Sequence, residues 1–134
     1  MTVTFAPTGV DAQTTMVCSY ASGAQAVLVS SIETLLGNRA VIAGREGRIE
    51  IHGTWYRPTS FSLIPRLGVA SDGEVERFTF PVAGNGLRFE ADEVAQCVRA
   101  GLVESPLVPL DETLEILGAM DLVRRQISLR YPFE

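Results

Sequence analysis

The sequence has 134 residues, of which 46% are hydrophobic and 20% are charged, and these are the proportions of one folded domain rather than a disordered chain. The formal net charge of -5 argues against a nucleic-acid or anionic-membrane surface, because phosphate binding requires clustered cations and the arginines here are scattered. Lysine is absent, which excludes Schiff-base chemistry, a lysine general acid and a P-loop lysine.

The two cysteines and the N-terminal segment indicate a cytoplasmic location. Cys18 and Cys97 fall in a predicted strand and a predicted helix, far below the cysteine density of a disulfide-stabilised secreted scaffold, so we expect both to be reduced. No signal peptide is visible, and no stretch approaches the run of about 20 apolar residues that a membrane span requires.

Alternating apolar and polar residues predict six or seven short strands before residue 83. A strand or extended lead-in over residues 1–13 precedes a hairpin of 14–20 and 24–32, then a second hairpin of 39–43 and 48–52, and further strands at 61–64 and 75–82. Residues 53–59 form a polar and aromatic connector in which Pro58 disfavours an interior strand, and residues 71–73 form a turn.

Two amphipathic helices are predicted over residues 89–101 and 111–128. Their apolar residues recur at helical spacing, at Val94, Cys97, Val98 and Leu102 in the first and at Leu114, Leu117, Met120, Val123 and Ile127 in the second. Gly101 is suited to end the first helix, and Asp111 is a candidate N-cap for the second. Asp121 and Arg125 have the spacing of a surface ion pair.

These elements predict a single α+β domain over residues 1–134. Its six- to seven-stranded, predominantly antiparallel sheet would carry the two main helices on one face. The strands at 24–32 and 39–43 carry apolar residues at both odd and even positions, which indicates burial on both faces of the sheet. We therefore expect the face opposite the helices to be available for dimerisation and the chain to form a homodimer.

The sequence contains no complete catalytic constellation, so we expect no catalytic, cofactor-binding or metal residues. Gly84-Asn85-Gly86 supplies only two of the three glycines of a dinucleotide fingerprint and follows an antiparallel strand, so it is either a plain loop that needs positive φ or a loop that faces a ligand. His52 is the only histidine and is more consistent with a surface imidazole at a strand end than with a catalytic one.

The remaining charged and aromatic residues suggest a wall or an interface rather than reacting groups. Glu90, like its acidic neighbours in the first helical turn, is explained by the helix dipole. Arg45 and Arg48 are solvated turn residues or holders of an anionic ligand. Trp55, beside an arginine in a proline-containing connector, suits an interface or a pocket wall, with ordinary edge packing as the alternative. The candidate substrate-wall or interface residues are Trp55, Arg57, Asn85 and Gly86.

Several segments, in their order and spacing, resemble the C-terminal domain of the Gfo/Idh/MocA oxidoreductases, in the branch of dimeric dihydrodiol dehydrogenase and NADP-dependent xylose dehydrogenase. These segments are Thr8-Gly9-Val10-Asp11, Ala43-Gly44-Arg45-Glu46-Gly47-Arg48-Ile49, Trp55 with Arg57-Pro58-Thr59, Phe89-Glu90-Ala91-Asp92-Glu93-Val94, Gly101, Glu104-Ser105-Pro106, Pro109-Leu110, Met120-Asp121, Arg124, Ile127 and Tyr131-Pro132. The resemblance covers essentially the whole chain.

The resemblance implies that this chain is one part of an NAD(P)-dependent oxidoreductase that acts on a sugar or diol. In the family, an N-terminal Rossmann domain binds NAD(P), and the C-terminal domain walls the substrate site and joins two subunits. The chain resembles only the second part and lacks the glycine fingerprint and the family's catalytic lysine. We therefore expect it to be inactive alone and to bind no NAD(P). The alternative is a freestanding, non-enzymatic interaction module, and the upstream reading frame separates the two hypotheses.

Overall fold

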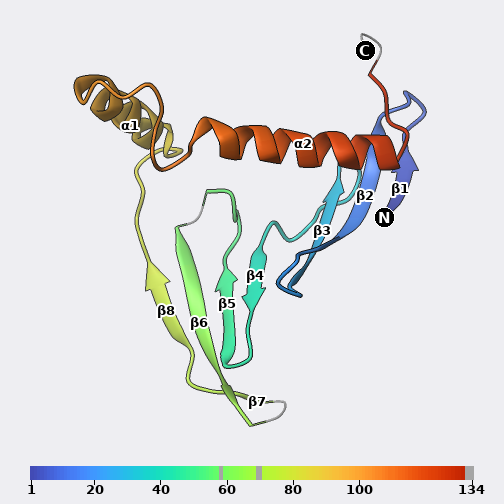
Figure 1. Cartoon of the computed structure of the whole chain (residues 1–134). Helices are drawn as coiled ribbons and strands as arrows, with labels where there is room; N and C mark the ends of the chain where they lie inside the picture. Colours follow the sequence, from blue (N-terminus) through green and yellow to red (C-terminus); the bar gives the residue numbers. More distant parts are fainter. Residues whose placement is uncertain (58, 69–70, 132–134) are drawn as a thin grey trace. The chain divides into compact units, whose positions relative to one another are not determined.

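The computed structural model describes residues 1–57, 59–68 and 71–131 and has the α+β class that the sequence predicts (Figure 1). Its elements are β1 (Thr2–Phe5), β2 (Asp11–Ser19), β3 (Gln25–Ser31), β4 (Ala40–Ala43), β5 (Gly47–Ile51), β6 (Ser60–Leu67), β7 (Ser71–Asp72), β8 (Glu76–Thr79), α1 (Leu87–Arg99) and α2 (Leu110–Gln126). Both predicted hairpins are present, and all strand pairs are antiparallel. Pro58, to which the sequence prediction assigns the break in the connector, lies outside the described residues.

The strands form two sheets rather than the one continuous sheet expected from the sequence. Within the described ranges, β1, β2 and β3 pair in that order, whereas β4, β5, β6, β7 and β8 form a second sheet. The interruption follows β3, where the Ser31 hydroxyl accepts hydrogen bonds from the backbone N–H groups of Glu33 and Thr34 and turns the chain out of the strand. The predicted turn at residues 71–73 instead contains the short strand β7.

The chain divides into two compact units, each with one sheet and one helix. The first unit joins Met1–Leu36 with the segment that begins at Val103, and it holds β1–β3 and α2. The second unit is the continuous segment Gly37–Leu102, and it holds β4–β8 and α1.

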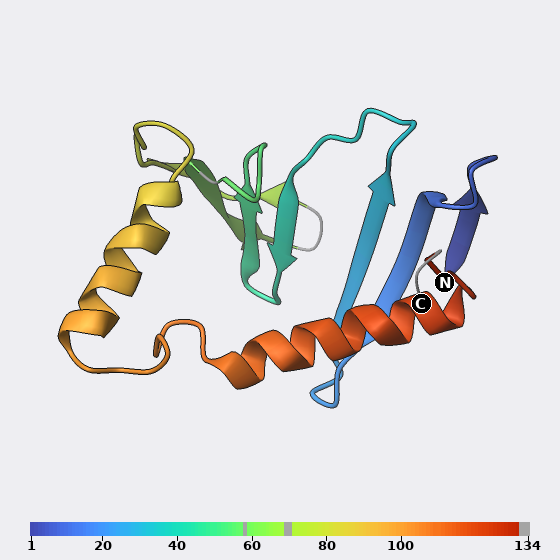
Figure 2. The same cartoon turned by 90° about the horizontal axis from the view of Figure 1, so that it is seen from above.

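In the first unit the buried residues come from both ends of the chain. Ala12 and Thr14 on β2 are 1% and 2% exposed, and Ile127 and Leu129, just after α2, are 8% and 7% exposed. The C-terminal end of α2 lies beside β2 in both views of the chain (Figures 1 and 2), which explains this burial. The earlier part of the predicted apolar stripe of α2 is exposed, since Leu114, Leu117 and Met120 are 65%, 50% and 56% exposed.

The start of α2 differs from the prediction because a distant carboxylate takes the place of the expected cap. Asp111 lies inside the first turn, and Pro109 occupies the N-cap position, where it has no hydroxyl or carboxylate to offer. The Glu104 carboxylate instead accepts a hydrogen bond from the free backbone N–H of Leu110 at 2.7 Å. Near the other end, Asp121 pairs with Arg124 at 2.7 Å, one residue earlier than the predicted partner Arg125.

The ends of α1 agree closely with the sequence. The helix begins at Leu87, two residues before the predicted start, and Gly86 occupies the N-cap position with a φ of 84°. It ends as predicted before Gly101, whose φ of 68° allows Leu102 N–H to donate to the Cys97 carbonyl at 2.9 Å.

The sheet of the second unit has one apolar and one largely polar face. The strand registers place Ile42 opposite Ile49, Ile49 opposite Leu63, and Phe61 opposite both Ile51 and Phe78. Directly paired residues point to the same side of a sheet. This side is made up of Ala40, Ile42, Ile49, Ile51, Phe61, Leu63 and Phe78, with Phe80 that stacks on Phe61 and one charged residue, Glu76, opposite Leu63. We call it the apolar sheet face.

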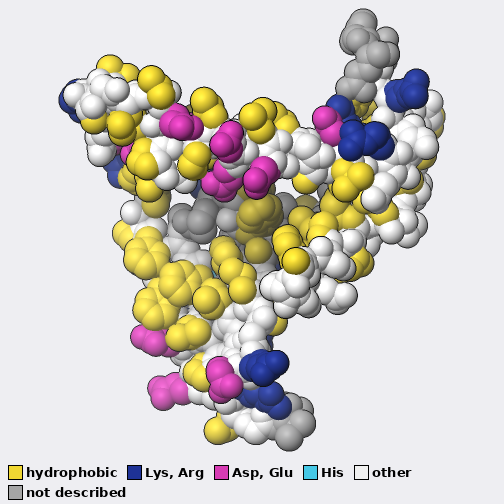
Figure 3. Space-filling view, viewed as in Figure 1, with side chains coloured by type: hydrophobic (Ala, Val, Ile, Leu, Met, Phe, Trp, Pro, Cys, Tyr) yellow, Lys and Arg dark blue, Asp and Glu magenta, His cyan; other side chains and the backbone are white. Residues whose placement is uncertain are grey.

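The apolar sheet face is uncovered within the described residues of the second unit. Ile42, Leu63 and Phe80 are 61%, 38% and 55% exposed, and hydrophobic side chains gather over β5, β6 and β8 in Figure 3. The opposite face carries Arg48, Glu50, Ser60, Ser62 and Arg77. Neither helix, over the residues that the structure describes, is long and apolar enough to cross a membrane.

Candidate functional site

Two loops of the second unit bring the sequence-predicted residues together. The loop between β5 and β6 carries Trp55 and Arg57, and the loop between β8 and α1 carries Asn85 and Gly86. The Arg57 guanidinium donates a hydrogen bond from Nη1 to Asn85 Oδ1 at 2.5 Å, although the two residues are 28 positions apart. This bond fixes the direction of the guanidinium and leaves its other N–H groups available to a ligand.

Beside this bond lies a cavity of about 550 Å³, which is within the size range of small-molecule sites. Its lining residues are Thr54, Tyr56, Arg57, Asn85, Leu87 and Glu90. The cavity thus offers a guanidinium, an amide, a carboxylate and two hydroxyls around one apolar residue. These groups can donate hydrogen bonds to a polyhydroxylated ligand and accept hydrogen bonds from it.

Trp55 and Gly86 border this cavity without lining it. The Trp55 ring packs edge-to-face against the Tyr56 ring with centroids 6.0 Å apart, and the two residues are 49% and 69% exposed. Gly86 starts α1, and its carbonyl accepts a hydrogen bond from Phe89 N–H at 2.9 Å. Its positive φ of 84° agrees with the sequence-based interpretation of a loop that requires glycine.

Four lining residues are absent from the set of candidates that the sequence provides: Thr54, Tyr56, Leu87 and Glu90. The sequence offers no separate signal for Tyr56, which follows Trp55 in the connector, and the helix dipole alone is enough to explain Glu90. Glu90 does lie in the first turn of α1, but it also lines the cavity. The sequence feature that could have identified Glu90 is its position four residues after Gly86, in the helical turn that follows a glycine-containing loop.

The start of α1 does not fit a dinucleotide. A pyrophosphate site of that kind lies between a parallel strand and a helix, with three glycines in the turn. Here the preceding strand β8 pairs antiparallel with β6, and only Gly84 and Gly86 are present. Among the residues that the structure describes, no group of three or more histidine, cysteine or acidic side chains could hold a metal ion.

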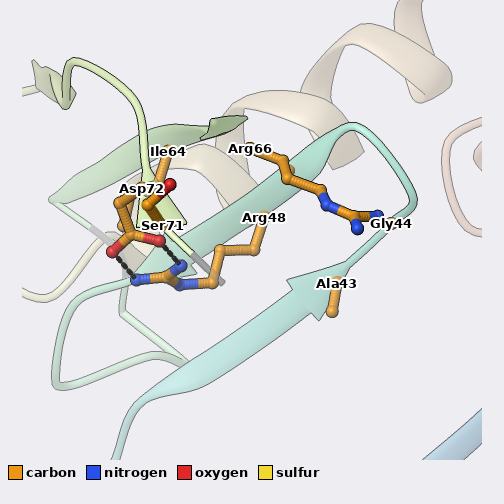
Figure 4. Close-up of a pocket in the computed structure, with 8 residues that line it drawn as sticks. Ala43, Gly44, Arg48, Ile64, Arg66, Ser71 and Asp72 are labelled. Carbon is orange, nitrogen blue, oxygen red and sulfur yellow. Dashed lines mark hydrogen bonds and ion pairs between the residues drawn. The ribbon is translucent and has the colours of Figure 1, made fainter. Parts of the chain in front are cut away.

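A second pocket, of about 320 Å³, lies between β5 and β7. Its lining residue Arg48 is already paired with the carboxylate of Asp72, another lining residue. Arg48 donates to both carboxylate oxygens of Asp72, at 2.5 and 2.9 Å, and to Glu50 at 2.7 Å, while Arg66 extends toward the Gly44 turn (Figure 4). These bonds raise the pKa of Arg48 and lower the pKa of Asp72. The Arg48 guanidinium is therefore bound by two carboxylates of the chain, an arrangement that the sequence pattern does not predict.

Three curated proteins with similar sequences are trans-1,2-dihydrobenzene-1,2-diol dehydrogenases. The chain is 32% identical over 133 residues to trans-1,2-dihydrobenzene-1,2-diol dehydrogenase of Xenopus tropicalis, 34% identical over 128 residues to that of Xenopus laevis, and 31% identical over 133 residues to that of Mus musculus. The chain is related to the dihydrodiol dehydrogenases. This finding confirms the branch resemblance drawn from the sequence.

The similarity to the dihydrodiol dehydrogenases covers most of this chain but a minor part of each relative. Each match includes 93% of the chain, whereas the chain spans only 38% of the length of the two Xenopus proteins and 37% of the mouse protein. No family model matches the sequence.

Proposed function

We propose that this chain is the C-terminal, substrate-side domain of an oxidoreductase that acts on a diol with NAD(P). The observation that carries the proposal is the similarity to dihydrodiol dehydrogenases along 93% of the chain. The cavity beside Arg57 and Asn85 supports it, because it combines polar groups with the exposed Tyr56 ring, against which the Trp55 ring packs edge-to-face. A cyclic diol presents the same combination, with an apolar ring and two hydroxyls.

In this proposal the residues of the chain bind and orient the substrate rather than react with it. Arg57, held by Asn85, donates a hydrogen bond to one hydroxyl, and the Glu90 carboxylate accepts one from the neighbouring hydroxyl. Tyr56 forms the wall against which the ring lies, and Trp55 supports it by the edge-to-face contact of the two rings. NAD(P), bound by a Rossmann domain outside this chain, supplies hydride acceptance, and that other domain carries the acid–base group.

The upstream reading frame and an activity assay test this function. We expect a Rossmann segment in frame upstream of residue 1, and we expect the joined protein to reduce NADP with trans-1,2-dihydrobenzene-1,2-diol or with a member of a sugar and diol panel. The isolated chain should show no NADPH binding by nicotinamide fluorescence. Micromolar NADPH binding by the isolated chain, or an upstream frame without such a segment, would overturn the proposal.

The role of Arg57 is tested in the joined protein by substitution with methionine. Removing one charge-assisted hydrogen bond should raise the KM for the diol by roughly tenfold, with a smaller change in kcat. Arg45→Met is the matched control, because Arg45 lies in the turn between β4 and β5 and does not line the cavity. An unchanged KM in Arg57→Met would contradict a substrate-wall role.

The uncovered apolar sheet face supports a second proposal, that two copies of the chain form a homodimer. Exposed contiguous apolar faces of this kind mark interaction surfaces, and identical chains most often associate about a two-fold axis. The same observation favours the alternative function, a non-enzymatic dimerisation module. The module hypothesis requires a native start at Met1 and no Rossmann segment, so the upstream sequence decides between the two functions.

A further inference from the structure

The loop that carries Trp55 and Tyr56 is exposed but firmly anchored. We call residues 53–57 the aromatic loop. Its backbone is held at one point by a hydrogen bond of 2.9 Å from Trp55 N–H to the Asn38 carbonyl. Gly53 permits this approach, because a Cβ at that position would lie 3.0 Å from the same carbonyl oxygen. A further bond of 2.9 Å, from Arg57 N–H to the Thr54 carbonyl, closes the turn.

The other anchor of the aromatic loop is His52, the residue immediately before it. The imidazole Nδ1 lies 2.8 Å from the Ser60 hydroxyl, and Nε2 lies 3.1 Å from the Ser62 hydroxyl. Both serines lie on β6 and are buried, at 9% and 6% exposed. The His52 backbone N–H also donates to the Ser60 carbonyl at 3.1 Å.

Two hydroxyls at the two ring nitrogens leave the imidazole little freedom to rotate. A neutral imidazole has one donor and one acceptor nitrogen, and a serine hydroxyl can serve as either partner. Both ring nitrogens are therefore satisfied within the sheet, and a change of ring orientation would leave a buried hydroxyl without a partner. His52 thus joins the end of β5 to two positions on β6 at the point where the chain leaves the sheet.

We infer that His52 is a positioning residue, which holds the aromatic loop so that Trp55 and Tyr56 are in place before a ligand arrives. The inference rests on the proposed function for the identity of the ligand, but the anchoring itself does not. A loop that is already ordered loses less conformational entropy on binding and so binds more tightly than a mobile loop with the same side chains. The sequence indicates that His52 is a surface residue, and in this inference its role is to hold the aromatic loop in place.

Because Trp55 is the sole tryptophan of the sequence, its fluorescence reports the aromatic loop directly. In the full chain without ligand, His52→Ala should lower the Trp55 anisotropy and increase acrylamide quenching, while the far-UV circular dichroism stays that of the wild type. His52→Asn should recover much of the anisotropy, because an amide near the Nδ1 position can still bond to Ser60. Arg77→Ala is the control on the same sheet face, since Arg77 makes none of the His52 bonds.

The possible outcomes separate this inference from the proposed function. Unchanged anisotropy and quenching in His52→Ala would overturn the positioning role, and so would an equal change in the Arg77→Ala control. If His52→Ala does not fold, Ser60→Ala combined with Ser62→Ala removes the same bonds, and the same two measurements on that variant decide the question. A chain that shows the expected Trp55 changes, while the joined protein fails to oxidise any diol, would refute the proposed function only.

Discussion

Arg48 shows how much one side chain can organise locally. Its guanidinium joins β5 to β7 by a bidentate contact with Asp72, 24 residues away, and also contacts Glu50 on its own strand. A planar guanidinium suits this arrangement because its N–H groups match the two oxygens of a carboxylate. The pair fixes the position of a hairpin whose second strand has only two residues.

The ion pair gives a pH-dependent contribution to stability, and its sign follows from the lowered pKa of Asp72. The ion pair contributes fully to stability at pH values above about 3.9, the pKa of the Asp72 carboxyl in the unfolded chain. This contribution is lost as the pH falls through the lower pKa that Asp72 has in the folded chain. Asp72→Asn should therefore lower the Tm at neutral pH, and the difference from the wild type should vanish in acid. Glu74→Gln removes a nearby carboxylate outside this pair, and a Tm loss in this control equal to that of Asp72→Asn would refute the specific role.

At the scale of elements, the hairpin of β4 and β5 depends on close approach to β6. Gly47 begins β5 opposite Pro65, and a Cβ added there would lie 2.4 Å from the Ile64 carbonyl oxygen and 2.9 Å from Pro65 Cα. Both of these atoms belong to the backbone, so the contact cannot be relieved by rotating a side chain. Gly44, at the other corner of the turn, would place its Cβ 3.6 Å from the nearest atom, an ordinary contact.

Gly47→Ala should destabilise the chain by about 1–3 kcal/mol, because β5 must move away from β6 to accommodate the methyl group. Gly44→Ala should be close to neutral. Urea unfolding of the two variants and the wild type measures both effects. Equal unfolding free energies for the two alanine variants would show that the close approach at Gly47 is not what orders this hairpin.

For the whole molecule, the alternation of β4 provides a matched test of dimerisation. Ile42 belongs to the apolar sheet face and is 61% exposed, whereas its neighbour Val41 points to the opposite face and is 53% exposed. We expect the wild type to sediment as a dimer at micromolar concentration. Ile42→Asp should give a monomer, because it introduces an unpaired charge into the contact, while Val41→Asp should remain dimeric. A monomeric wild type, or equal effects of the two aspartates, would contradict the proposed interface.

The sequence is sufficient to predict the two helices and most strands of this fold, but not how the elements combine. Alternation and glycine turns are local signals, so both hairpins and the Gly101 helix end can be predicted. Which strands share a sheet depends on pairing, which the pattern of a single strand does not contain. The short strand β7 escapes prediction because two residues have no periodicity, and its position depends on the distant contact of Asp72 with Arg48.

The same limit applies to the candidate site. Trp55, Arg57, Asn85 and Gly86 can each be selected from residue type and context, but the Arg57–Asn85 bond cannot, because it joins loops far apart in the sequence. The His52 anchor has one recognisable signal. Ser60 and Ser62 are two residues apart on the following strand and so share a face, which is the spacing needed to hold one ring between two hydroxyls.

The discontinuity of the first unit determines the order in which a ribosome can complete the two units. Strands β1–β3 are released first, yet Ile127 and Leu129, which are buried in the same unit as Ala12 and Thr14, are released only after the whole second unit. At translation rates of about 5–20 residues per second, the first sheet waits several seconds for these residues. The unit that starts later in the chain is therefore ready to fold first.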